Sequence, residues 1–330
     1  MRVLLIGEFG VGSLGRYYSH AFAELGIEVG TYSLPLAPTS GRSKLSTRIL
    51  RRGLRGLIWR RAEAACLASL DRPWDFVLAL KAPFLSKRTV AKMRERCENT
   101  LMLYPDSPWD QYTMRRDVVS VLSMFRTTFI WSHALVSQLR SHGVNSEYLA
   151  FAHDPRDYRP PDPGTDPKPS ALVFVGQVYE RRIAWLRALE GLAVRVSGTG
   201  WKQALFGEKS TIRVDPRHYS GPAARDAYVS SAAALNILDH KNLSGHNMRT
   251  FEIPGTRTLM IGDSTADIEH FFPNREASLT ASTPEEFRAQ CEWALSHPEL
   301  SNAIAAEGYS RVLGQTYTHR AQEIISYVTR

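Results

Sequence analysis

The chain has 330 residues, and its 43% of hydrophobic and 22% of charged residues are ordinary globular values that suit two domains. Its formal net charge is +8, but six arginines between residues 46 and 61 contribute most of it, and the charges of the other residues nearly balance. Such a local excess of positive charge argues against a dedicated nucleic-acid binder. Three widely spaced cysteines fit neither a zinc site nor a disulfide framework, and no apolar run is long enough to span a membrane, so a cytoplasmic protein is expected.

The first predicted elements are a buried parallel strand over residues 3–6 and a helix over about residues 14–25. Between them, Gly10, Gly12 and Gly15 have the G-x-G-x-x-G spacing, which lets backbone approach a ligand at a helix N-terminus. A tight strand-to-helix turn without a ligand explains the same spacing equally well.

A dinucleotide-binding site would need an acidic residue at the end of the second strand, where it would hold the adenosine ribose. That strand is predicted over residues 28–32, and Thr31, Tyr32 and Ser33 stand where the acid is required. An NAD-dependent oxidoreductase is therefore disfavoured.

Residues 46–70 predict a helix with leucines on one side and arginines, together with Trp59, on another. Apolar residues, arginine and tryptophan together suit an anionic membrane interface, so peripheral contact through residues 46–61 is one interpretation. A helix packed on the core with a solvated basic face is the other.

Strands over residues 76–80 and 100–104, joined by a helix over residues 87–96, predict an α/β domain with a parallel sheet. Ligands of such sheets collect at the carboxyl ends of the strands. Asp106 follows the second of these strands and is the preferred catalytic candidate, as a general base toward a hydroxyl group. Capping of the next helix is the alternative for Asp106, and it suits Asp110 better.

A strand that ends at Trp131 is followed by Ser132 and Gly143, which suit the N-cap and C-cap of a helix. His133 lies at the N-terminal end of this helix. It is a candidate for contact with phosphate or with an acceptor, and a structural histidine is the alternative.

Residues 154–169 are rich in proline and charge and have no apolar periodicity, so we place the domain boundary there. This predicts an N-terminal domain over residues 1–153, a linker over 154–169 and a C-terminal domain over 170–330. The second domain opens with a strand over residues 171–175 that ends at Gly176. Arg181 and Arg182 follow in the first turns of a helix, where they suit a diphosphate or are simply solvated.

The segment HNMRTFE, residues 246–252, has helical spacing, and Pro254-Gly255 is expected to stop the helix before a strand over residues 258–261. Asn247 and Arg249 at the helix start offer backbone N–H groups and a planar cation, which suit a phosphate. Glu252 lies one turn further on, where it could accept hydrogen bonds from a ribose diol. A solvated Arg–Glu pair is the alternative.

This segment, with Gly255 and Gly262-Asp263, resembles the donor-binding segment of CgeB-like (spore-maturation-type) glycosyltransferases. The motif YTHRAQEII near the C-terminus and DPRDYRP over residues 154–160 extend the resemblance. It implies the GT-B fold, with two Rossmann-like domains whose parallel sheets face a central cleft, and a last helix that packs back on the first domain. It also implies a nucleotide-sugar donor held by the second domain.

The resemblance extends the candidate site. CgeB-like proteins carry an Asp-and-Pro element like that around Asp106, and a G-x-G-W element like that at Gly198, while Tyr219 corresponds to a position near the nucleotide base. The expected donor-binding residues are Gly176, Arg182, Gly198, Tyr219, Asn247, Met248, Arg249 and Glu252. Gly10, Gly12 and His133 would then line the cleft. No D-x-D motif follows a strand, so no metal and no cofactor beyond the substrate is expected.

These observations predict a metal-independent glycosyltransferase that moves a sugar to a hydroxyl of a glycan, lipid-linked or protein acceptor, in the cytoplasm or at the inner face of the membrane. Many retaining GT-B enzymes carry a second Glu eight residues before the ribose-binding one, and here Ser244 stands there, which weakens a retaining assignment. The alternative function is a non-catalytic protein that binds a sugar nucleotide or polysaccharide on the same scaffold.

Overall fold

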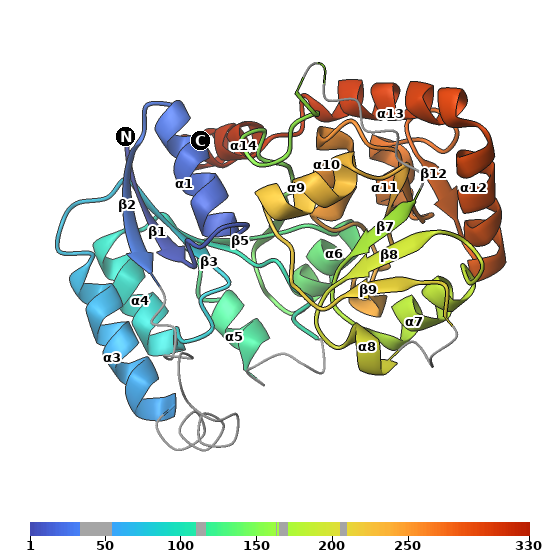
Figure 1. Ribbon diagram of the computed structural model, residues 1–330. Coiled ribbons are helices and arrows are strands. Elements are labelled where there is room, and N and C mark those ends of the chain that lie inside the picture. Colours follow the sequence, from blue (N-terminus) through green and yellow to red (C-terminus); the bar gives the residue numbers. More distant parts are fainter. Residues whose placement is uncertain (34–54, 110–116, 163, 165–170, 205–209) are drawn as a thin grey trace. The chain divides into compact units, whose positions relative to one another are not determined.

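The computed structural model describes the chain except residues 34–54, 110–116, 163, 165–170 and 205–209, and only the backbone of residues 55 and 56. The chain forms two compact units. Unit 1 comprises Met1–Ala150 and Ala321–Arg330, and unit 2 comprises Phe151–Arg320. Each unit contains a six-stranded parallel sheet with helices (Figure 1), so the predicted α/β class is confirmed.

Unit 1 alternates strands and helices along the chain, and its sheet has the order β2-β1-β3-β4-β5-β6. The elements are β1 Arg2–Gly7, α1 Leu14–Glu24, β2 Glu28–Ser33, α3 Arg55–Ala68, β3 Phe76–Leu80, α4 Lys87–Arg96, β4 Thr100–Leu103, α5 Val118–Leu122, β5 Thr127–Ile130, α6 His133–Ser141 and β6 Ser146–Tyr148. Because all pairings are parallel, the carboxyl ends of these strands share one edge of the sheet.

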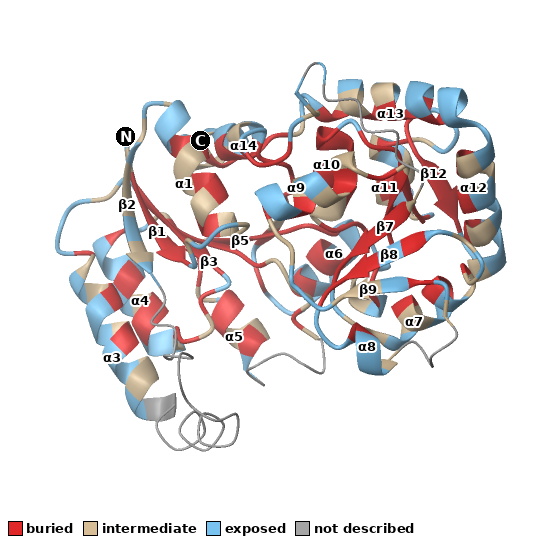
Figure 2. Ribbon diagram, viewed as in Figure 1, coloured by how far each residue is buried: buried red, intermediate tan, exposed pale blue. Residues whose placement is uncertain are grey.

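The central strands of unit 1 are continuous apolar runs because helices cover both faces of the sheet. Every residue of β3 is buried, as the red strands in Figure 2 show, whereas β2 at the edge is only partly buried. The helix α4 begins where Ser86 accepts the N–H of Thr89 with its hydroxyl, at 3.3 Å. Both β3 and α4 have the bounds that the sequence predicts.

Unit 2 has the sheet order β12-β11-β10-β7-β8-β9. Its elements are β7 Leu172–Val175, α7 Glu180–Arg187, β8 Val194–Ser197, α8 Trp201–Ala204, β9 Arg213–Asp215, α9 Pro222–Val229, β10 Ala233–Asn236, the 3₁₀ helix η1 His240–Asn242, α10 Arg249–Gly255, β11 Met260–Asp263, α11 Ala266–Phe271, β12 Leu279–Ala281, α12 Pro284–Ser296 and α13 Pro298–Val312. Figure 1 shows α9 and α10 on one face of this sheet and α7 and α8 on the other. The order reverses between β7 and β10, and the crevice at such a switch point, beyond the carboxyl ends of the strands, is where ligands of open α/β sheets bind.

The last helix, α14 Tyr317–Val328, has its first four residues in unit 2 and the rest in unit 1. Within unit 1, the hydroxyls of Tyr327 and Thr127 form a hydrogen bond of 2.5 Å, and the Tyr327 ring packs edge-on against Phe129. Among the described residues, no helix combines the length and hydropathy that a membrane span requires.

The helix α10 ends at Gly255, where Pro254-Gly255 is predicted to stop it. Two other predicted elements differ in detail from the structure. The apolar residues 148–151 predict the last strand of the first domain, but β6 covers Ser146–Tyr148, and the Phe151 N–H instead donates to Nε2 of His246 at 3.1 Å. Of the helix expected over residues 46–70, α3 covers Arg55–Ala68, and residues 46–54 lie outside the described part.

The structure also separates the glycines of the first loop. A Cβ at Gly15 would lie 2.3 Å from the Glu8 carbonyl oxygen, whereas one at Gly10 would meet nothing within 4 Å. We therefore expect Gly15→Ala to lower the free energy of unfolding by about 1–3 kcal/mol, and Gly10→Ala to change it by less than about 0.5 kcal/mol. Urea unfolding of the two variants measures both values, and equal losses would contradict this account of the loop.

Candidate functional site

Two glycines at the carboxyl ends of β7 and β8 pack backbone against backbone. The Gly176 N–H donates to the Ser197 carbonyl at 2.9 Å, and the Gly176 carbonyl accepts the indole N–H of Trp201 at 2.7 Å. Gly198 has φ +150°, and a Cβ there would lie 2.1 Å from the Gly176 oxygen. Both glycines are buried, and the fold itself therefore requires Gly198.

Arg182 supplies a buried cation at this edge. Its Nε donates to the Ile237 carbonyl at 2.9 Å, and Nη1 donates to the Gln177 carbonyl at 3.1 Å. Burial, and then the nearby charge of Arg249, lower the pKa of Arg182 to about 10, so the guanidinium stays charged at neutral pH. Within the described part of the chain its hydrogen bonds go to main-chain carbonyls and not to a carboxylate, which suits this cation to attract an anion.

Arg249 is the first residue of α10 and is partly exposed. Its Nε donates at 2.6 Å to the carbonyl of Val175, the last residue of β7. Burial alone would lower the pKa of Arg249, but Tyr228, Glu252 and Tyr158 raise it. The structure thus fixes one nitrogen of a cation at the switch point, next to the backbone of Gly176.

Glu252 lies one turn further along α10 and is only 7% exposed. The Tyr158 hydroxyl donates to its carboxylate and accepts the Gly221 N–H at 3.1 Å. Burial raises the pKa of Glu252 to about 7, Arg249 and Tyr158 oppose the increase, and Asp157 adds to it. Near neutral pH this carboxyl group therefore exists in both protonation states.

Asn247 and Met248 precede these two residues and shape the start of α10. The Asn247 side chain donates to Oδ1 of Asn236 at 2.9 Å and accepts the Thr250 N–H at 3.2 Å. These are the bonds of a helix-capping asparagine, so the structure explains this residue without a ligand. The side chain of Met248 is partly exposed, and its carbonyl accepts the Glu252 N–H at 3.0 Å.

Arg181, next to Arg182, is only partly exposed and is held by the protein. It forms an ion pair with the buried Asp263, at the end of β11, and Nη1 donates to the Leu238 carbonyl at 3.0 Å. Burial raises the pKa of Asp263 and the hydrogen bond from Arg181 opposes this. The Arg181 charge is thus largely neutralised, which distinguishes it from Arg182.

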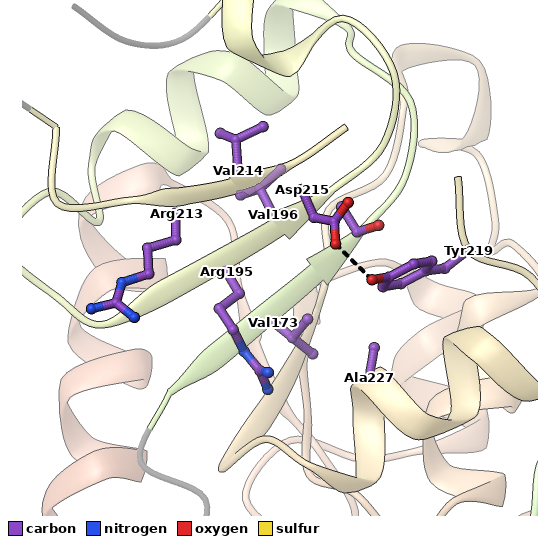
Figure 3. A pocket seen from close by; sticks show the side chains of 9 residues that line it. Val173, Arg195, Val196, Arg213, Val214, Asp215, Tyr219 and Ala227 are labelled. Carbon is purple, nitrogen blue, oxygen red and sulfur yellow. Dashed lines mark hydrogen bonds between the residues drawn. The ribbon is translucent and has the colours of Figure 1, made fainter. Parts of the chain in front are cut away.

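Tyr219 lies beyond β9, in the wall of an open pocket of about 180 Å³. Its hydroxyl donates to Oδ2 of Asp215 at 2.7 Å (Figure 3) and accepts from Arg217 at 2.8 Å. Arg195 and Arg213 lie at the other end of this pocket. Asp215 and Tyr219 at one end and the two arginines at the other make this pocket a second candidate binding site in unit 2.

Asp106 lies in unit 1, three residues beyond β4. Its Oδ2 is 2.5 Å from Nζ of Lys81, and about a third of the side chain is exposed. The next described helix, α5, begins at Val118 with Asp117 in the N-cap position, so Asp106 does not cap it. Asp110 lies outside the described residues.

Two of the three other candidates of unit 1, Gly12 and His133, have local structural explanations. Gly12 has φ +77°, in the left-handed region that favours glycine, and Ser13 caps α1 by accepting the Arg16 N–H at 3.4 Å. The His133 ring stacks on Tyr148 with centroids 3.8 Å apart. These contacts favour the tight turn and the structural histidine.

Sequence reasoning missed Tyr158 and Tyr228 beside α10 in unit 2, and Lys81 beside Asp106 in unit 1. Tyr158 and Tyr228 contact Arg249 or Glu252 through tertiary packing, from 91 and 21 residues away in sequence respectively, counted from Arg249. Tyr158 lies within the motif DPRDYRP, which resembles a linker, but nothing in this motif indicates that Tyr158 bonds to Glu252.

Comparison with known proteins decides the fold. A family model described as glycosyl transferase-like matches residues 180–326, and no curated protein matches the chain. Sucrose-phosphate synthase from Thermosynechococcus elongatus superposes with a TM-score of 0.72 at 12% identity, over 100% of this chain and 98% of that one. The fold is GT-B.

Two further GT-B structures agree with this assignment. Anabaena HepE in complex with UDP-glucose has a TM-score of 0.66 at 8% identity, over 100% of this chain and 99% of that one. Trehalose 6-phosphate synthase from Burkholderia multivorans has a TM-score of 0.66 at 12% identity, over 99% and 96%. The narrower CgeB-like assignment remains a prediction.

Proposed function

We propose that the protein is a glycosyltransferase that moves a sugar from a nucleotide-sugar donor to an acceptor hydroxyl. The observation that carries this proposal is the pair Arg249 and Glu252, one turn apart on α10 beside the switch point of the GT-B unit 2. The glycosyl transferase-like family model includes both residues, and the Anabaena HepE structure contains UDP-glucose.

The donor diphosphate would be bound by positive groups of this chain. Arg249 and Arg182 supply two guanidinium groups at the carboxyl end of β7, where Gly176 and Gly198 let the backbones after β7 and β8 pack closely. As the sugar–phosphate bond breaks, negative charge grows on the diphosphate, and fixed cations stabilise it. Arg249 and Arg182 would therefore stabilise the leaving diphosphate without a metal ion.

The remaining donor contacts would come from the same unit. The Glu252 carboxylate would accept the ribose hydroxyls, and the exposed part of Met248 and the ring of Tyr219 would flank the nucleoside. Asn247 would not contact the donor directly. Its hydrogen bonds to Asn236 and Thr250 would hold the start of α10 in place.

For the acceptor we propose Asp106 of unit 1 as the general base. In an inverting reaction the acceptor oxygen bonds to the anomeric carbon, the bond to the diphosphate breaks, and the acceptor proton passes to Asp106. Partial exposure and a fixed Lys81 partner suit a carboxylate to this role. Acceptors of glycan, lipid-linked or protein type all offer the required hydroxyl.

A melting-temperature screen with UDP-, GDP-, dTDP- and CMP-linked sugars tests this proposal. A ligand at 100 times its dissociation constant stabilises the native state by about 2.7 kcal/mol, so one donor class should raise the melting temperature clearly. Hydrolysis or transfer of that donor would then show turnover. Binding without turnover would favour a non-catalytic sugar-nucleotide protein, and no binding by any member would contradict the proposal.

Glu252 makes donor binding depend on pH. Its pKa of about 7 means that binding a diol to the carboxylate costs a deprotonation below neutral pH. We expect the donor dissociation constant to rise by about tenfold for each pH unit below 7. Titration calorimetry between pH 5.5 and 8 with a nucleotide sugar measures this, because its diphosphate lacks the terminal phosphate that titrates near pH 6. The Glu252→Gln variant should bind weakly with a flat profile, and an equally steep profile there would contradict the role.

A further inference from the structure

The turn that follows β3 in unit 1 has an unusual backbone. Lys81 has φ +63° and Ala82 has φ +23°, and the Ala82 N–H donates to the Leu80 carbonyl at 2.8 Å. A three-residue turn closed in this way around a residue of positive φ is rare and strained. Glycine would adopt it with less strain, so the lysine side chain is present despite an unfavourable backbone.

The strained turn brings two charged groups together. The Lys81 N–H donates at 3.0 Å to the carbonyl of Leu103, the last residue of β4, and so ties the turn to the neighbouring strand. The Lys81 ammonium lies 2.5 Å from Oδ2 of Asp106, which follows that strand. Lys81 is the one cation that forms an ion pair with Asp106 among the described residues.

Stability does not explain this arrangement. Lys81 and Asp106 are 47% and 34% exposed, and ion pairs between exposed side chains contribute little to folding. Backbone strain of this kind persists at functional sites, where the surrounding structure enforces it. The place of Lys81 in the sheet also suits a functional site. The sheet order reverses between β1 and β3, and Lys81 follows the carboxyl end of β3, where ligands of such sheets bind.

We propose that Lys81 is a positioning residue for Asp106, which rests on the proposed role of Asp106 as general base. The ammonium holds Oδ2 and fixes the carboxylate, so that Oδ1 is the oxygen that accepts the proton from the acceptor hydroxyl. The acceptor oxygen then bonds to the anomeric carbon, and the electron pair of the breaking sugar–phosphate bond leaves with the diphosphate. Lys81 keeps its proton throughout.

The variant Lys81→Gly separates this role from a structural one. It relieves the backbone strain and removes the ammonium, so the melting temperature should stay equal or rise, while kcat for hydrolysis or transfer of a nucleotide sugar from the four-base panel falls about 10- to 100-fold. The donor dissociation constant should not change. Lys81→Arg keeps a cation within reach of Asp106 and should recover most of the lost kcat.

Comparison with Asp106→Asn distinguishes the two proposals. If Asp106→Asn keeps full turnover, the assignment of the base fails, and the role of Lys81 fails with it. If Asp106→Asn is inactive but Lys81→Gly is fully active, or if Lys81→Gly loses activity and stability together without rescue by Lys81→Arg, only the role of Lys81 is overturned. In the Asp106→Asn background, Lys81→Gly should cause no further loss of kcat, because the lysine acts through the carboxylate.

Discussion

Replacing Asp106 with asparagine should lower the rate of sugar transfer by about 10²- to 10⁴-fold, the usual contribution of a positioned general base. Asparagine has the same shape but cannot take the acceptor proton. Steady-state kinetics with the donor found by the melting-temperature screen measures the loss. Donor affinity should stay unchanged, because the donor residues belong to unit 2 and Asp106 to unit 1.

A matched carboxylate controls for loss of charge alone. Asp71 is also in unit 1 and forms an exposed ion pair with Arg96 at 3.2 Å, so Asp71→Asn removes the same charge from a surface position. Asp71→Asn should leave the rate within about twofold, since exposed ion pairs contribute little. A rate for Asp106→Asn close to that of the wild type would show that another group, or none, serves as base.

Replacing Arg249 with glutamine should weaken donor binding by about 10- to 100-fold, the loss expected when charge-assisted hydrogen bonds to a phosphate disappear. The variant removes a cation that α10 holds against the last residue of β7. Titration calorimetry with the nucleotide sugar measures the change. Arg249→Lys should recover part of the affinity, because lysine keeps the charge but loses the planar fork.

Arg213 provides the control for this second experiment. It is exposed, lies in the same unit and lines the end of the pocket that is opposite Tyr219. Arg213→Gln should not alter donor affinity. If Arg213→Gln weakens binding and Arg249→Gln does not, the donor diphosphate occupies that pocket and the assignment of Arg249 is wrong.

The alternation of strands and helices was predictable because burial on both faces gives parallel strands continuous apolar runs, and capping residues mark the helix ends. Ser132 is one example, since its hydroxyl accepts the Leu135 N–H at 3.4 Å at the start of α6. The position of Phe151 was not predictable in this way. It is apolar and follows a strand, but its N–H is bound by a histidine 95 residues away.

The candidate site was predictable where its residues lie close together in sequence. Arg249 and Glu252 share one helical turn, so their spacing alone placed them side by side. The bond from Tyr158 to Glu252, and the environment that raises the pKa of that carboxyl group, depend on packing between distant segments. The strained turn at Lys81 has no counterpart in the sequence, because positive φ is usually signalled by glycine or asparagine.

The most direct measurement of the central claim is a crystal structure of the protein with the nucleoside diphosphate of the donor class found in the screen. The proposal predicts the diphosphate within hydrogen-bond distance of Arg249, near Arg182 and the Gly176 backbone, and the ribose hydroxyls on the Glu252 carboxylate. A nucleotide bound elsewhere, with Arg249 and Glu252 still in contact only with the protein, would contradict it.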